Sequence, residues 1–115
     1  GYGYAEAPVA ERQKWGPLIT KYLRDRATLC LVLVLLDARR SLTEQEAGLF
    51  EMLEEFGRPT RIVATKIDKF PKSKRKPTIT NLSKDLGVPA MAFSAKTGEG
   101  TDEVWQVIGR ACGIV

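Results

Sequence analysis

The apolar run LCLVLVLL at residues 29–36, which ends at Asp37, decides the fold class of this 115-residue chain. A continuous stretch of branched apolar residues is typical of a strand in a parallel sheet that is covered on both faces. Its length suits one strand and falls well short of the 18 or so residues that a membrane span needs. The run therefore predicts an α/β domain and argues against a membrane partner.

The residues after this run predict a helix with clear ends. Thr43 and Glu46 match the T-x-x-E capping box, in which side chains at the start of a helix satisfy free backbone N–H groups. Apolar residues then recur at helical spacing, and Gly57 stands where helices commonly end. The run and this helix together form one β-α unit.

Strand and helix patterns alternate from here to the end of the chain. We expect strands at 61–65 and 90–93, helices at 78–86 and 101–112, and a polar loop at 66–77. A further helix is expected over 9–26, ahead of the apolar run, with a kink or a late start at Pro17. The resulting βαβαβα order predicts three parallel strands joined by right-handed crossovers.

The first strand is the most apolar of the three, which is unusual for the edge of a sheet. An exposed, apolar edge strand is a template for aggregation, so natural domains cover it. We therefore expect a partner along residues 29–36. Either the chain is half of a larger sheet, or two copies associate through this strand as a homodimer.

Composition excludes several kinds of site. The chain has no histidine and two cysteines, so it holds neither a Ser-His-Asp triad nor a Cys/His zinc cluster. We interpret Cys30 and Cys112 as core or near-core residues in a reducing cytoplasm, and Trp15, Tyr22 and Trp105 as packing residues. The net charge is +4, and basic residues are concentrated between 58 and 84. This segment either binds a polyanionic partner such as RNA or is a loop exposed to solvent.

Polar residues follow each predicted strand, at the edge of the sheet where ligands bind in open parallel sheets. Asp68 can accept two N–H bonds from the N1 and N2 of guanine, a donor pair that adenine lacks. The stem of Lys66 can cover the base, and a backbone N–H of the Ser94–Ala95 turn can reach O6. Asp37 and Arg39 we interpret as loop anchors.

Thr65-Lys66-Ile67-Asp68 resembles the [N/T]KxD motif of P-loop GTPases, and Ser94-Ala95-Lys96 resembles their SAK motif. More narrowly, the chain resembles the EngB ribosome-biogenesis GTPases over essentially its whole length. The stretches that carry this resemblance are GYGYA at 1–5, KWG at 14–16, YL at 22–23, DARR at 37–40 and TKIDK at 65–69.

The resemblance implies that residues 1–115 are the C-terminal part of a single EngB-type domain. This part would be a parallel, three-stranded half of a Ras-like fold, without the P-loop strand and the switch regions. It further implies that Thr65 holds the nucleotide-binding loops together, that Lys66 and Asp68 bind guanine, and that Ser94, Ala95 and Lys96 shape the O6 side. Gly1 would offer its amide to the γ-phosphate of GTP.

The family's function gives the remaining expectations. They are binding of GTP or GDP, Mg²⁺ held by the absent half, help in assembling the large ribosomal subunit, contact with ribosomal RNA, a role in cell division and septation, and a cytoplasmic location. Tyr2 stands where Ras-like proteins carry a catalytic Gln, so we assign no catalytic residue. Because the family's P-loop and Mg²⁺ site would lie in the other half, we expect no hydrolysis by this chain alone. The alternatives are a basic RNA- or ribosome-binding module that never hydrolyses GTP and a self-associating half-domain.

Overall fold

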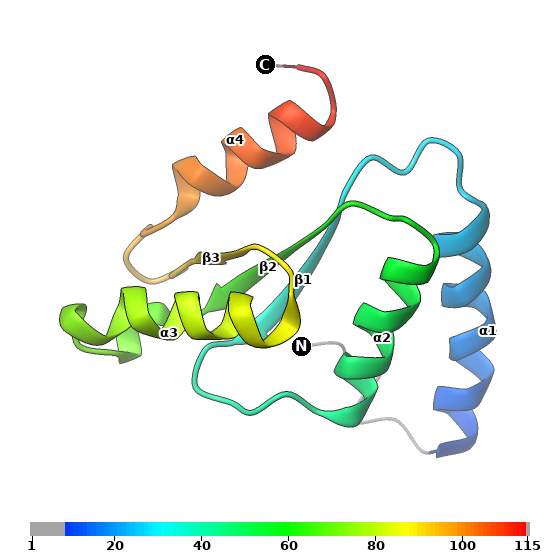
Figure 1. Cartoon of the computed structure of the whole chain (residues 1–115), viewed down its shortest axis with the longest axis horizontal. Coiled ribbons are helices and arrows are strands. Elements are labelled where there is room, and N and C mark those ends of the chain that lie inside the picture. The colour runs from blue at the N-terminus through cyan, green and yellow to red at the C-terminus, as the bar shows by residue number, and fades with distance from the viewer. Residues whose placement is uncertain (1–8, 115) are drawn as a thin grey trace. The chain divides into compact units, whose positions relative to one another are not determined.

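The computed structural model describes residues 9–114, which form two compact units. The first unit comprises residues up to 29 together with 42–58, and the second comprises 30–41 together with 59 onward. The first contains helices α1 (Val9–Asp25) and α2 (Glu44–Glu55). The second contains strands β1 (Val32–Asp37), β2 (Thr60–Thr65) and β3 (Ala90–Ala92), the 3-10 turn η2 (Ile67–Lys69), and helices α3 (Lys72–Leu86) and α4 (Thr101–Ala111) (Figure 1).

The capping box that the sequence predicts at the start of α2 is confirmed. The Glu46 amide donates to Thr43 Oγ1 at 3.1 Å, and the Thr43 amide donates to Glu46 Oε1 at 2.9 Å. After the helix, Gly57 has a φ of 66°, the left-handed conformation that suits glycine at a helix end. Arg58 then donates to the carbonyl oxygens of Leu23 and Arg24, which ties the ends of the two helices together.

Helix α1 lies close to its predicted bounds and continues through Pro17. Among its described side chains only Leu23 is buried, whereas Leu18 is 69% exposed and Tyr22 is 52% exposed. The interpretation of Tyr22 as a packing residue is therefore wrong. The side chain of Trp15 lies outside the described residues.

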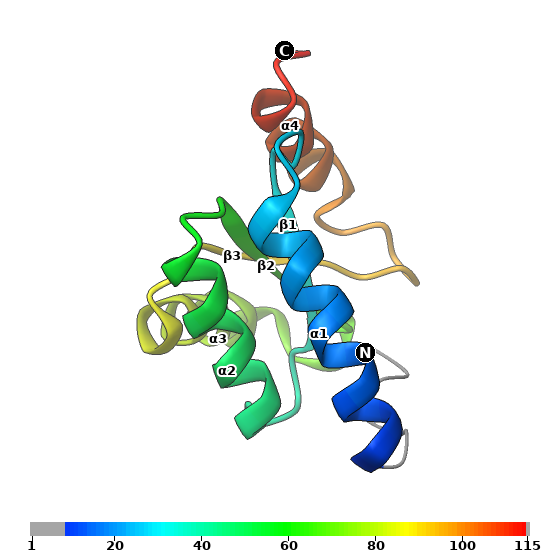
Figure 2. The ribbon, with the colours of Figure 1, turned by 90° about the vertical axis from the view of Figure 1, so that its right-hand side faces the viewer.

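The three strands of the second unit are parallel and lie in the order β1-β2-β3. Helices lie on both sides of this sheet: α3 on one side and α4 on the other in both views (Figures 1 and 2). Its core is formed by apolar residues of the strands and of η2, namely Val34, Leu36, Ile62, Val63, Ala64, Ile67 and Met91.

Strand β1 differs from its prediction in two respects. It begins at Val32 rather than residue 29, and its burial alternates, with Val34 and Leu36 buried but Leu35 51% exposed. The expectation that both faces are covered is therefore wrong for this chain. In the described part of the chain, β1 pairs on one side only, with β2, and forms an edge of the sheet.

Helix α3 begins at Lys72 rather than at residue 78, because residues 72–77 are helical rather than a loop. Pro71 suggested an irregular segment, but it occupies the N-cap, where a missing N–H costs little. The residues that follow are rich in lysine and arginine, which are good helix formers. Pro77 is tolerated within the helix, and Gly87 ends it with a φ of 66°.

Three further expectations about side chains are wrong. Cys30 and Cys112 are exposed rather than part of the core, and neither forms a disulfide. Trp105 is 66% exposed on α4 and is not a packing residue within the described part of the chain. From residue 9 to residue 114, no helix is both long and apolar enough to cross a membrane.

Candidate functional site

The register of the sheet brings the polar segments to one edge. Asp37 pairs with Thr65 between β1 and β2, and Ala64 pairs with Ala92 between β2 and β3. The segments 65–69 and 94–100, which follow β2 and β3, therefore begin side by side at the carboxyl ends of the strands. All of the candidate base-binding residues belong to the second unit.

The segment after β2 is held at several points. Thr65 Oγ1 donates to the carbonyl oxygen of Leu36 at 3.2 Å, and the Ile67 amide donates to that of Phe93 at 3.1 Å. Ile67 is completely buried. Lys66 adopts the left-handed conformation with a φ of 61°, which is costly for a residue with a Cβ and often marks a functional turn.

Asp68 and Ser94, predicted to share a site, are in direct contact. The fully buried Ser94 donates from Oγ to Asp68 Oδ1 at 2.8 Å, and the amide of Thr97 donates to the same hydroxyl at 3.1 Å. Asp68 therefore has a structural partner within the chain as well as a predicted role in base binding. A carboxylate can accept about four hydrogen bonds, so this contact leaves acceptor capacity for a ligand.

The surroundings of Asp68 favour its ionised form. Donation by the Ser94 hydroxyl, together with the nearby charges of Lys69 and Lys96, lowers the pKa of the Asp68 carboxyl below its usual value. The group is therefore a permanent acceptor at neutral pH. This is the protonation state needed to accept hydrogen bonds from two N–H groups of one ligand.

The segment after β3 forms a tight turn. The Ser94 amide donates to the Glu99 carbonyl oxygen at 3.0 Å, and the Gly98 amide donates to the Ser94 carbonyl oxygen at 2.8 Å. This closure leaves Ala95 and Lys96 exposed. The turn therefore presents both residues to solvent beside Asp68.

Asp37 acts as a loop anchor, as the sequence suggested. Its carboxylate accepts from the Arg39 amide at 2.9 Å and from two nitrogens of the Arg39 guanidinium at 3.0 and 3.1 Å. The Lys66 ammonium lies 3.6 Å away, a contact that the sequence did not reveal. The Asp37 side chain is only 12% exposed. Its hydrogen bonds from Arg39 are the main reason that the pKa of the Asp37 carboxyl lies well below its usual range.

This shift gives a prediction for stability against pH. The pKa of Asp37 is lower in the folded chain than in the unfolded chain, where it is about 3.9. Ionised Asp37 therefore contributes fully to the free energy of unfolding above this pH, and the contribution is lost as the pH falls through the pKa of the folded chain. In Asp37→Asn, the free energy of unfolding measured by urea denaturation should fall less between pH 5 and pH 2 than in the wild type. The exposed Asp85 gives the control, since Asp85→Asn should retain the wild-type slope; equal slopes for all three proteins would contradict the prediction.

Two further expectations concern phosphate and metal binding. Gly1 lies outside the described residues. From residue 9 to residue 114, no group of three or more Asp, Glu, Cys or His side chains could hold a metal ion.

Comparison with known proteins shows similarity to EngB proteins. A probable GTP-binding protein EngB of Lactiplantibacillus plantarum is 43% identical over 112 residues, which is 94% of this chain and 57% of that protein. Over nearly its whole length the chain is similar to part of this EngB protein. A second EngB relative, from Syntrophus aciditrophicus, is 39% identical over 98% of this chain and 59% of its own length. The chain thus spans a little over half the length of the curated EngB proteins it matches, and no protein-family model matches it.

Solved structures confirm the fold expected from the EngB resemblance. A crystal structure of a probable GTP-binding protein EngB superposes with a TM-score of 0.76 at 18% identity, covering 92% of this chain and 69% of that one. The elongation factor SelB from Methanococcus maripaludis has a TM-score of 0.67 at 25% identity, covering 85% of this chain and 23% of its own. The three-stranded sheet is therefore part of a P-loop GTPase fold.

Proposed function

We propose that this chain supplies the guanine-recognition half of an EngB-type GTP-binding domain. The ionised Asp68 carboxylate, held by Ser94 at 2.8 Å, is the observation that carries the proposal. It would accept the N1 and N2 protons of guanine, while the exposed Lys66 covers the base. The exposed Ala95–Lys96 turn would face O6, and Thr65 would steady the loop through Leu36.

Binding of GDP to the chain alone tests this role. A hydrogen bond to a charged group contributes about 1.5–3 kcal/mol, and a millimolar complex needs about 4 kcal/mol. Two hydrogen bonds from guanine to Asp68, together with the contact of Lys66 with the base, just reach this value. We therefore expect a Kd in the millimolar range or weaker, measured by amide chemical-shift titration. ADP should cause no shifts at Asp68. A micromolar Kd, or equal responses to both nucleotides, would contradict the proposal.

We further propose that phosphate and Mg²⁺ binding, and any hydrolysis of GTP, depend on the part of EngB proteins that this chain does not span. Gly1 would then offer its amide to the γ-phosphate. Because β1 pairs on one side only in the described part, its free edge is where we expect either a strand of that other part or a second copy of the chain. The family resemblance also supports a cytoplasmic role in assembling the large ribosomal subunit and in septation.

Ribosomal RNA contact would use the exposed lysines at the start of α3. Lys72, Lys74 and Lys76 lie on one helix with no acidic residue in its first turn. Reversing all three to Glu should weaken association with large ribosomal subunits and reduce its salt slope by about 2, since each lost phosphate contact contributes 0.7–0.9.

A variant with the same change of net charge provides the control for this experiment. Lys21, Lys84 and Arg110 are also exposed but lie outside residues 72–76. Their reversal to Glu should leave the salt slope closer to that of the wild type. The RNA contact would be refuted if both triple variants bound equally well, because charge alone would then explain the association.

A further inference from the structure

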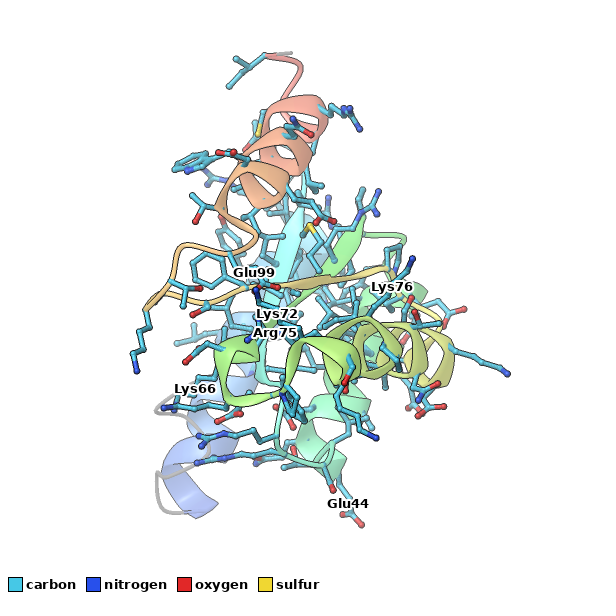
Figure 3. The ribbon with its side chains drawn as sticks, turned by 90° about the vertical axis from the view of Figure 1, so that its left-hand side faces the viewer. Glu44, Lys66, Lys72, Arg75, Lys76 and Glu99 are labelled. Atoms are coloured by element: carbon cyan, nitrogen blue, oxygen red, sulfur yellow. The ribbon has the colours of Figure 1, made fainter. Side chains whose placement is uncertain are left out.

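Arg75 differs from the other basic residues of α3 because its guanidinium is engaged on two sides. Its side chain is only 21% exposed. Nε donates to the carbonyl oxygen of Phe70 at 2.9 Å, and Nη1 donates to Glu99 Oε1 at 2.7 Å. Figure 3 shows Arg75 and Glu99 lying together, with Lys72 beside them on the same helix.

One side of this guanidinium holds the loop that carries Asp68. The Phe70 amide donates to the Ile67 carbonyl oxygen at 3.0 Å and so closes the η2 turn around Asp68. The Arg75 Nε bond to the Phe70 carbonyl oxygen fixes the end of that turn against α3. Movement of Phe70 would therefore change the direction of the Asp68 carboxylate.

The other side holds the loop that carries Ala95 and Lys96. Glu99 accepts the Ser94 amide on its carbonyl oxygen at 3.0 Å, and its own amide donates to Thr97 Oγ1 at 3.2 Å. An ion pair from Arg75 to the Glu99 side chain thus reaches the residue that closes this turn. The two loops are joined at their inner ends by the Asp68–Ser94 bond and at their outer ends by Arg75.

We propose that Arg75, through Glu99 and Phe70, is a positioning residue that sets the spacing between the two loops of the guanine site. This inference rests on the proposed function of those loops. A planar guanidinium suits the role, because its donors leave in fixed directions and can hold two oxygens at once. A lysine ammonium keeps the charge without this fork. Ligand groups must be held to within about half an ångström for productive contact, so loss of one tie should weaken binding.

Nucleotide titrations of the isotope-labelled chain by NMR test the inference. Arg75→Gln and Glu99→Ala should each weaken GDP binding about fivefold, at the lower end of couplings between distinct sites. The double variant should be no weaker than the worse of the single variants, because both remove the same tie. Arg75→Lys should also weaken binding despite its retained charge. Lys84→Gln, which removes one charge from the same helix, should match the wild type.

A second readout separates positioning from general stability. Thermal unfolding of each variant shows how much of the chain is folded at the titration temperature, and Kd values are compared for folded protein only. A role in stability alone would lower the melting temperature and leave Kd and the amide shifts of Asp68 and Ala95 unchanged. That result would overturn the positioning role while GDP binding by the wild type still stood. No GDP response in the wild type would refute the proposed function, and the inference with it.

Discussion

Replacing Asp68 with Asn is expected to abolish the response of the chain to GDP. The change removes the second carboxylate oxygen and places an N–H donor before the N2 donor of guanine. Each lost charge-assisted hydrogen bond costs about 1.5–3 kcal/mol, so Kd should rise by at least tenfold and leave the measurable range. Asn keeps an oxygen that can accept from Ser94 Oγ, so the unfolding free energy should change little.

The same substitution predicts a gain as well as a loss. Xanthine carries an oxygen in place of the N2 amino group, so the new amide N–H can donate to it while Oδ1 accepts from N1. Asp68→Asn should therefore respond to xanthosine diphosphate and not to GDP. Glu103→Gln removes one exposed carboxylate from α4 and should behave as the wild type. Retention of GDP binding by Asp68→Asn would show that another group reads the base.

The sequence predicted those parts of the fold that local chemistry determines. The capping box at Thr43, the glycine that follows α2 and the parallel βαβαβα order all depend on short patterns. It failed where longer-range packing decides. Residues 66–77 looked like a loop because they contain two prolines, yet Pro71 serves as an N-cap and the helix continues through Pro77.

The candidate site shows the same division. The motifs at 65–68 and 94–96 were found because they follow strands, and the sheet places them at one edge. The bond between Asp68 and Ser94 was missed because its partners are separated by 26 residues. Arg75 and Glu99 were missed because they are separated by 24 residues and neither belongs to a recognisable motif. Sequence patterns thus identified the residues that would touch a base, and only the structure identified those that hold them in place.

Gly100→Ala should cause the largest loss of stability, for a reason that lies in the loop after β3. Gly100 has a φ of 84°, and a Cβ there would overlap the Ala92 carbonyl oxygen. The left-handed conformation costs a residue with a Cβ about 1–2 kcal/mol, and relief of the overlap adds about 1–3 kcal/mol. We expect a total loss of about 2–5 kcal/mol in urea denaturation.

Gly98 separates the two contributions. It has nearly the same φ, 82°, and an added Cβ would meet nothing within 4 Å. Gly98→Ala should therefore lose only about 1–2 kcal/mol, and the difference between the variants measures the contact with Ala92. Since that oxygen belongs to backbone, it can move only if β3 or the 94–100 turn moves with it. Gly100→Ala should consequently shift the amide resonance of Ser94 as well. Equal losses of unfolding free energy in the two variants would contradict the prediction, because they would mean that the loop moves away from the added Cβ at no cost.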